Sequence, residues 1–292
     1  MQRPRANTLG KLVVGVGRLC RFSNSIPAAV LVLIGAYLTA GWPLSTTTWW
    51  AATAMWFVTA FGYVSNDYID VVEDNVNKPE RPLPSGAVGS VLVIAVAIGL
   101  AVGALWTSAT LGWLPLAIAG AVIVLLLFYN VRLKSVPGVG NLLIGGLAGC
   151  TLLTGGVAES GFQWSVFIHL WPLVVLLALF VTAREVLKTV EDIAGDRAAA
   201  KQTLATRWGI YKTLQIFACL TLQLLFVTIY VYWTTGRSAL YLGIMVVGII
   251  GPLLYSLIYL GQDAAPKRVA HCLSLLKGSY FAGILALLLL VN

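Results

Sequence analysis

Long hydrophobic runs alternate with short polar segments along the whole chain. A helix needs about 20 mainly apolar residues to cross a bilayer, with a range of roughly 17 to 25. Nine runs fall in or near this range, and they cover residues 25–42, 47–66, 88–108, 110–130, 140–157, 165–187, 208–233, 238–260 and 270–291. The pattern therefore predicts an all-α multi-pass membrane protein with nine transmembrane helices. Several links between the runs are too short to hold a soluble domain, so we expect a single domain over residues 1–292.

The composition agrees with this membrane assignment. Hydrophobic residues make up 59% of the chain, charged residues make up only 10%, and the mean hydropathy is +0.88. Soluble globular proteins contain about 25% charged residues, so the composition excludes that class.

Positive charge is distributed unevenly along the chain. The net charge is +8, with 19 Lys and Arg residues. If the nine runs alternate in direction, every one of these cations except Arg237 falls on the side of the N-terminus. Cytoplasmic segments are enriched in Lys and Arg, so we expect the N-terminus in the cytoplasm, the C-terminus across the cell membrane, and no nucleic-acid partner. Residues 1–24 are basic and weakly amphipathic, which predicts an interfacial segment that contacts membrane lipid.

Four acids follow the second hydrophobic run within eight positions, in a chain that has only 11 acids. They are Asp67, Asp70, Glu73 and Asp74. One Asp at the centre of a membrane helix costs about 2.5–3.5 kcal/mol, so a cluster at the membrane edge needs compensation. In a helix, Asp67, Asp70 and Asp74 would share one face. This arrangement indicates a bound cation.

A second acid cluster follows the sixth run and contains Glu185, Glu191, Asp192 and Asp196. Lys188, Asp192 and Asp196 are four positions apart and would share a helical face. Both clusters follow an even-numbered run, so we expect both at the cytoplasmic membrane edge, and a basic link follows each one.

Two acidic helix faces flanked by cations suit a polyanion that is bound through divalent metal. Mg²⁺ takes oxygen ligands and is usually bound by one or two carboxylates together with substrate phosphates. A lipid-linked diphosphate needs metal at its head and an apolar cavity for its tail. Its carbon–oxygen bond could break with the help of the metal and the cations, which would leave an allylic cation for a nucleophile to capture.

The segment Asn66-Asp67-x-x-Asp70-x-x-x-Asp74 resembles the first aspartate motif of the UbiA-type intramembrane prenyltransferase superfamily, and Asp192-x-x-x-Asp196 resembles its second. The likeness extends to Arg21 with Asn24, residues 78–86, residues 129–134, Asn141 and residues 184–197. The amino-acid sequences of residues 77–86 and 184–197 resemble those of the branch that contains digeranylgeranylglyceryl phosphate synthases. Thr189 departs from the pattern, because many relatives are expected to have an acid there.

The resemblance implies nine helices around a central cavity, cytoplasmic cap loops, and a requirement for Mg²⁺, which we take as two ions. It implies metal ligation by Asp67, Asp70, Asp74, Asp192 and Asp196, assisted by Asn66. It implies contact with the diphosphate by Lys134, Lys188, Arg132 and Arg81. It implies that the cavity is lined, or the acceptor oriented, by Tyr129, Asn141, Asn24 and Arg21.

The implied reaction transfers an isoprenoid chain from a prenyl diphosphate donor to a small lipophilic acceptor. The sequence favours an aromatic or quinone-type acceptor. Transfer to the hydroxyl of a polyprenylglyceryl phosphate and cyclisation on the donor's own double bond, as in related terpene cyclases, stay open. An ion-coupled transporter is a different class, and the clustering of the acids at one membrane edge disfavours it.

Overall fold

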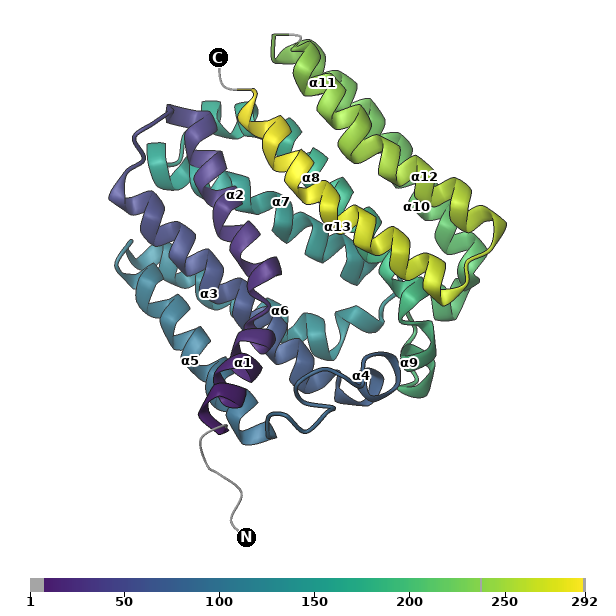
Figure 1. The fold of residues 1–292 in the computed structure, drawn as a ribbon. Helices are drawn as coiled ribbons and strands as arrows, with labels where there is room; N and C mark the ends of the chain where they lie inside the picture. The colour runs from purple at the N-terminus through teal and green to yellow at the C-terminus, as the bar shows by residue number, and fades with distance from the viewer. Residues whose placement is uncertain (1–7, 237, 291–292) are drawn as a thin grey trace. The chain divides into compact units, whose positions relative to one another are not determined.

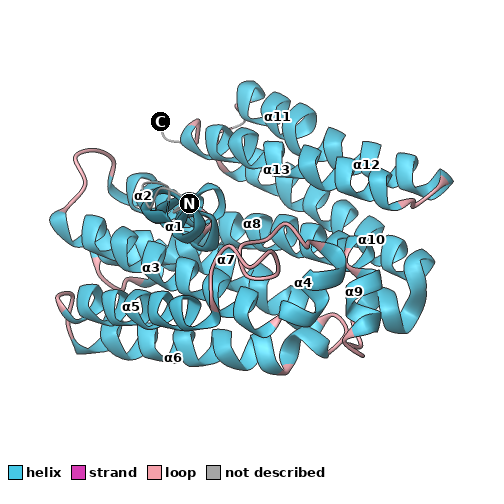
Figure 2. Ribbon diagram, turned by 60° about the horizontal axis from the view of Figure 1, so that its bottom comes forward, coloured by secondary structure: helices cyan, strands magenta, loops and turns pink. Residues whose placement is uncertain are grey.

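The computed structural model describes residues 8–236 and 238–290 of this chain. Every regular element in this part of the chain is a helix (Figure 2). By their internal contacts the residues divide into two compact units, and each unit is described by itself. Of the described residues, unit 1 contains those up to 30 and 50–133, and unit 2 contains those in 31–49 and from 134 onward.

Unit 1 carries the first acid cluster on a long helix with a short one after it. Its helices are α1 (Thr8–Cys20), the start of α2 (Phe22–Ala40), most of α3 (Thr46–Ile69), α4 (Val71–Asn77), α5 (Ser90–Ala109) and α6 (Trp113–Val131) (Figure 1). Helices α5 and α6 pack against each other. A Cβ atom at Gly103 would lie 2.8 Å from the Phe57 ring, so only glycine allows α5 to approach α3 this closely.

Unit 2 is built around α8 (Trp164–Glu191), whose main neighbours are α7 (Val139–Ser160), α10 (Leu204–Thr234) and α13 (Pro266–Leu288). The other elements are η2 (Leu133–Ser135), α9 (Ile193–Ala198), α11 (Ala239–Met245), the π-helix η3 (Val246–Ile250) and α12 (Gly251–Gln262), with the end of α2 and the start of α3. A Cβ atom at Gly149 would lie 2.6 Å from the carbonyl oxygen of Val174, which explains the close contact between α7 and α8.

Eight helical segments of the described residues are long and apolar enough to cross a membrane. They are Phe22–Ala40, Ser90–Ala109, Trp113–Val131, Val139–Ser160, Trp164–Glu191, Leu204–Thr234, Ala239–Gln262 and Pro266–Leu288. They match eight of the nine predicted runs. The run 47–66 forms α3, which is not among them, because threonines, tryptophans and a polar C-terminal end lower its hydropathy. The prediction of a ninth transmembrane helix and of cytoplasmic caps therefore stays a prediction.

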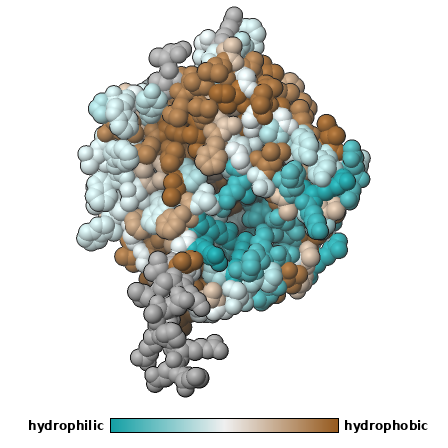
Figure 3. Space-filling view, viewed as in Figure 1, coloured by the Kyte–Doolittle hydropathy of each residue, from teal (hydrophilic) through white to brown (hydrophobic). Residues whose placement is uncertain are grey.

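Large apolar side chains cover much of the surface of these helices. Val91 is 83% exposed, Trp113 is 79% exposed and Phe281 is 76% exposed. Figure 3 shows broad brown areas, which are hydrophobic side chains at the surface. A soluble protein rarely exposes apolar surface on this scale, so the exposed helix faces fit contact with lipid.

Candidate active site

The first acid cluster lies where α3 passes into α4. Asp70 stands between the two helices with φ −89° and ψ 16°. Its backbone N–H donates to the Asn66 carbonyl at 2.8 Å, and its own carbonyl accepts from the Asp74 N–H at 2.9 Å. Helical hydrogen bonding thus continues across the joint. Asp67, Asp70 and Asp74 are 2%, 2% and 5% exposed, and Glu73 is 4% exposed, so four carboxylates are buried in one short stretch.

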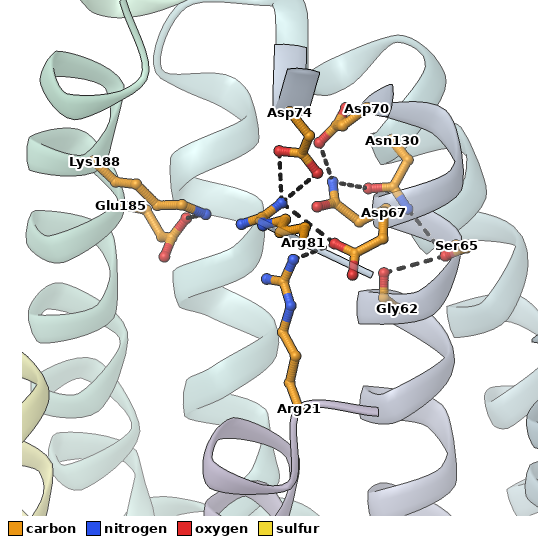
Figure 4. Close-up of polar contacts among 11 residues, drawn as sticks. Arg21, Gly62, Ser65, Asp67, Asp70, Asp74, Arg81, Asn130, Glu185 and Lys188 are labelled. Carbon is orange, nitrogen blue, oxygen red and sulfur yellow. Dashed lines mark hydrogen bonds and ion pairs between the residues drawn. The ribbon is translucent and has the colours of Figure 1, made fainter. Parts of the chain in front are cut away.

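Two arginines compensate these buried carboxylates (Figure 4). Arg81 Nη1 donates to both oxygens of Asp74, at 2.7 and 2.5 Å, and lies 3.3 Å from Asp67 Oδ1. Arg21 donates to the same oxygen of Asp67, and its guanidinium lies 5.1 Å from the centre of the Tyr63 ring. Charge-assisted hydrogen bonds of this kind are stronger than neutral ones. The two arginines supply the compensation that the sequence required of this cluster.

A chain of amide and hydroxyl bonds borders the acids. Asn66 Nδ2 donates to Asp70 Oδ2 at 2.7 Å and to Asn130 Oδ1 at 3.1 Å. Asn130 Nδ2 donates to Ser65 Oγ at 3.1 Å, and Asn130 is only 3% exposed. Figure 4 shows these bonds together. They connect the end of α6 with the end of α3.

The second acid cluster lies where α8 ends and α9 begins. Glu185 Oε1 accepts from Arg184 Nη1 at 3.0 Å, and Glu185 Oε2 lies 3.6 Å from Lys188 Nζ. Asp192 is the joint between the two helices, and its carbonyl accepts from the Asp196 N–H at 3.0 Å. Asp196 is 3% exposed.

Loop contacts also fix the end of this second cluster. Thr203 Oγ1 donates to Asp196 Oδ2 at 3.0 Å, and the Lys201 N–H donates to the Asp196 carbonyl at 2.8 Å. Lys134 also interacts electrostatically with Glu185. Unit 2 therefore gathers Lys134, Lys188 and the two aspartates of the second motif around the end of α8.

Four of the predicted site residues are not part of the contacts described above. Arg132 is exposed at the C-terminal end of α6, and Asn24 accepts from its neighbour Ser23 Oγ at 3.3 Å. Tyr129 lies near the end of α6 and Asn141 near the start of α7, both half-buried. The roles of these four residues, like those of the other predicted site residues, stay predictions.

Sequence reasoning missed several residues that belong to the two clusters in the structure. Asn130 and Ser65 form the hydrogen-bond chain to Asn66. Glu185 pairs with Arg184 and Lys188, and Thr203 donates to Asp196. Asn130, Ser65, Glu185 and Thr203 were not among the predicted site residues. Asn130 lies inside the polar segment 129–134 that the sequence singled out, and Glu185 lies inside the second cluster. Ser65 and Thr203 carried no signal, because their importance depends on partners brought near by folding.

The first cluster has the donor chemistry for Mg²⁺. It offers buried carboxylate and amide oxygens, which are the ligands that this hard ion prefers. Within the residues that the structure describes, no three acid, histidine or cysteine side chains are close enough to bind a metal by themselves. Mg²⁺ usually keeps water and phosphate ligands beside one or two carboxylates. The residues therefore fit an ion whose coordination the phosphates of a substrate complete.

The fold and the site together define a class of protein. The chain is a multi-pass membrane protein whose apolar helices end in buried acids, and arginine or lysine pairs with those acids in each cluster. Such a site suits a lipid-bound polyanion that is handled at the membrane edge.

Comparison with known proteins gives the family. Residues 28–285 match the UbiA prenyltransferase family. A digeranylgeranylglyceryl phosphate synthase of Natronomonas pharaonis is 36% identical over 206 residues, which cover 70% of this chain and 73% of that protein. The chain therefore belongs to the UbiA prenyltransferase family and is a transferase of prenyl groups. The resemblance inferred from the two aspartate motifs is confirmed.

Solved structures share the fold. One, from work on digeranylgeranylglyceryl phosphate synthase in membranes, has a TM-score of 0.71 at 25% identity and covers 96% of this chain and 98% of its own. A UbiA homologue from Archaeoglobus fulgidus, bound to GPP and Mg²⁺, has a TM-score of 0.66 at 15% identity and covers 94% and 99% of the two chains. Because the Archaeoglobus homologue is only 15% identical, its likeness to this chain concerns the fold alone.

Proposed function

We propose that this enzyme moves an isoprenoid chain from a prenyl diphosphate to the hydroxyl of a polyprenylglyceryl phosphate. The observation that carries the proposal is the group of buried carboxylates at the α3–α4 junction, held beside Arg21 and Arg81. Buried acids with arginine partners suit metal and diphosphate together. The relatives that are named digeranylgeranylglyceryl phosphate synthase support the choice of acceptor.

The acceptor that the sequence favoured needs correction. An aromatic or quinone-type acceptor finds no support in the comparisons, whereas the glyceryl phosphate alternative does. The likeness in residues 77–86 and 184–197 pointed to the glyceryl phosphate branch. A preference for an aromatic acceptor had no comparable residue behind it.

In the proposed reaction the allylic carbon–oxygen bond breaks and its electron pair leaves with the diphosphate. When bound, Mg²⁺ supplies Lewis-acid stabilisation of the charge that builds on the leaving group, and the Archaeoglobus homologue with GPP and Mg²⁺ supports this requirement. The ligands would be Asp67, Asp70, Asp74, Asp192 and Asp196, and we keep the prediction of two ions. Phosphate oxygens would be bound by Lys134, Lys188, Arg132 and Arg81. The acceptor oxygen then attacks the allylic carbon and loses its proton.

This proposal treats residues 1–292 as one prenyltransferase domain in which both acid clusters act on the same donor. It also keeps the predicted orientation, with the N-terminus and the acid-bearing links in the cytoplasm and the C-terminus across the cell membrane. The uneven distribution of Lys and Arg supports that orientation. Action of both clusters on one prenyl diphosphate would explain why both aspartate motifs occur in one chain.

The test is an acceptor panel with purified protein in detergent or vesicles. Labelled geranylgeranyl diphosphate is incubated with a geranylgeranylglyceryl phosphate, with a hydroxybenzoate, or with no acceptor, each with Mg²⁺ or with chelator. We expect an ether product by mass analysis only with the glyceryl phosphate and Mg²⁺. A prenylated hydroxybenzoate would instead support an aromatic acceptor, and a cyclic hydrocarbon formed without acceptor would indicate a cyclase. No product and no diphosphate release with any donor of 10 to 20 carbons would contradict the proposal.

A further inference from the structure

A continuous chain of hydrogen bonds runs from the backbone of α3 to the acid Asp70, and it passes through α6. Ser65 Oγ donates to the Gly62 carbonyl at 3.2 Å and accepts from Asn130 Nδ2 at 3.1 Å. Asn130 Oδ1 accepts from Asn66 Nδ2 at 3.1 Å, and Asn66 Nδ2 also donates to Asp70 Oδ2 at 2.7 Å. Every member of this chain belongs to unit 1 (Figure 4).

The two ends of the chain fix the direction of every bond in it. The Gly62 carbonyl can only accept, so the Ser65 hydroxyl must donate to it. The Ser65 oxygen then accepts, so Asn130 must turn its NH₂ group toward Ser65 and its carbonyl toward Asn66. At the other end an ionised Asp70 can only accept, which again requires the NH₂ group of Asn66.

Both N–H bonds of the Asn66 amide are therefore used inside the protein. One goes to Asp70 and the other to Asn130. The Asn66 carbonyl oxygen, Oδ1, takes no part in this chain of hydrogen bonds. If Asn130 could not accept, only the bond to Asp70 would hold the Asn66 amide, and its oxygen would lose a fixed direction.

We propose that Asn130 is a positioning residue, which acts through Asn66 to present the Asn66 carbonyl oxygen to the metal that binds the diphosphate. This inference rests on the proposed function, because it assumes that Asn66 and Asp70 serve a metal-bound diphosphate. Asn130 suits the role because it is 3% exposed and both ends of its amide are bonded, so it has little freedom to rotate. Ser65 has a supporting part, since it sets which way Asn130 faces.

The test measures metal binding as well as turnover. Asn130→Leu removes the acceptor and keeps the number and branching of the side-chain heavy atoms, and Ser65→Ala leaves Asn130 in place but removes its anchor. Thr107→Val is the matched control, because the buried Thr107 hydroxyl bonds only carbonyls of its own helix α5, at 2.7 and 3.1 Å. Mn²⁺ binding is followed by EPR titration in the presence of inorganic diphosphate, and prenyl transfer is measured against Mg²⁺ and against acceptor.

We expect Asn130→Leu to weaken Mn²⁺ binding and to raise the Mg²⁺ concentration for half-maximal activity by about three- to tenfold, the loss that one neutral hydrogen bond produces. The KM for the acceptor should stay within about twofold. Ser65→Ala should produce a smaller shift in the same direction, and Thr107→Val should produce none. Because Ser65→Ala is a mild change, it keeps the test valid if Asn130→Leu does not fold.

A double-mutant cycle separates positioning from simple structural support. If Asn130 acts only through Asn66, then Asn66→Ala with Asn130→Leu should bind Mn²⁺ no more weakly than Asn66→Ala alone. Additive losses, or unchanged Mn²⁺ binding in an active Asn130→Leu enzyme, would overturn the inference and leave the proposed function intact. A wild-type protein that neither binds Mn²⁺ with diphosphate nor transfers a prenyl group would overturn both.

Discussion

The acids of the α3–α4 junction and those of the α8–α9 junction obtain their partners from different distances along the chain. Asp67 pairs with Arg21, 46 positions earlier, and Asn66 bonds Asn130, 64 positions later. In the second cluster Glu185 pairs with its neighbour Arg184 and with Lys188, three positions on. The first cluster is therefore a product of tertiary packing, whereas the second forms largely within one helix end.

Burial follows the same division for the paired acids. Asp67 and Asp74 are 2% and 5% exposed, whereas the side chains of Glu185 and Lys188 are 16% and 29% exposed. In the second motif Asp192 is half-buried, and Asp196, which Thr203 bonds, is 3% exposed. A buried charge that loses its partner is costly, and an exposed one is not. Loss of a partner should therefore cost stability in the first cluster and mainly ligand affinity in the second.

The largest expected effect would show that both clusters are needed for the reaction, although their acids obtain their partners differently. Asp70→Ala and Asp192→Ala should each reduce turnover by about a thousandfold or more, because each removes a proposed metal ligand. Diphosphate release from a labelled donor measures the loss, and size-exclusion profiles in detergent check folding. Normal turnover in either variant would remove that residue from the metal site.

The next effect separates the clusters by stability. Arg81→Gln leaves the buried Asp74 without the cation that bonds both of its oxygens and should lower the free energy of unfolding by about 3–5 kcal/mol. Thermal unfolding in detergent measures this change. The matched control is Arg18→Gln, since Arg18 is exposed on α1 in the same unit. Equal stability of the two variants would show that Asp74 does not depend on Arg81.

The corresponding change in the second cluster should have the opposite profile. Lys188→Gln removes a partly exposed, local ion pair, so the free energy of unfolding should fall by less than about 1 kcal/mol. The KM for the prenyl diphosphate should nevertheless rise by about tenfold, since Lys188 is a proposed diphosphate ligand. A KM equal to that of the wild type would show that Lys188 does not bind the diphosphate and only pairs with Glu185.

The smallest effect on activity is expected at Glu159, an acid that serves structure. Its carboxylate accepts from the Ser45 N–H at 3.0 Å, from Ser45 Oγ at 2.9 Å and from Thr48 Oγ1 at 2.5 Å, and so ties the end of α7 to the start of α3. Glu159→Gln should cost about 1 kcal/mol of unfolding free energy. Turnover and Mg²⁺ dependence should not change, and a large loss of turnover would place Glu159 in the reaction.

Much of the fold followed from the sequence because membrane helices obey a local rule. Eight of the nine predicted runs became helices long and apolar enough to span a membrane. The run that became α3 is the exception, because its threonines and tryptophans lower its hydropathy. The acids follow this run, with Asp67 near the C-terminal end of α3 and the others after that helix.

The sequence by itself determined the positions of the hydrophobic helices, both aspartate motifs, and the i, i+3 and i, i+4 relations within each cluster, since these depend only on neighbours along a helix. It also contained Arg21 and Arg81 as candidates. Only the tertiary structure decided that these two arginines share Asp67, and that Asn130 and Ser65 orient Asn66. Such contacts join residues 14 to 65 positions apart. They depend on how α3 packs against α6, the residue after α1 and the loop after α4, and no local pattern in the chain encodes that packing.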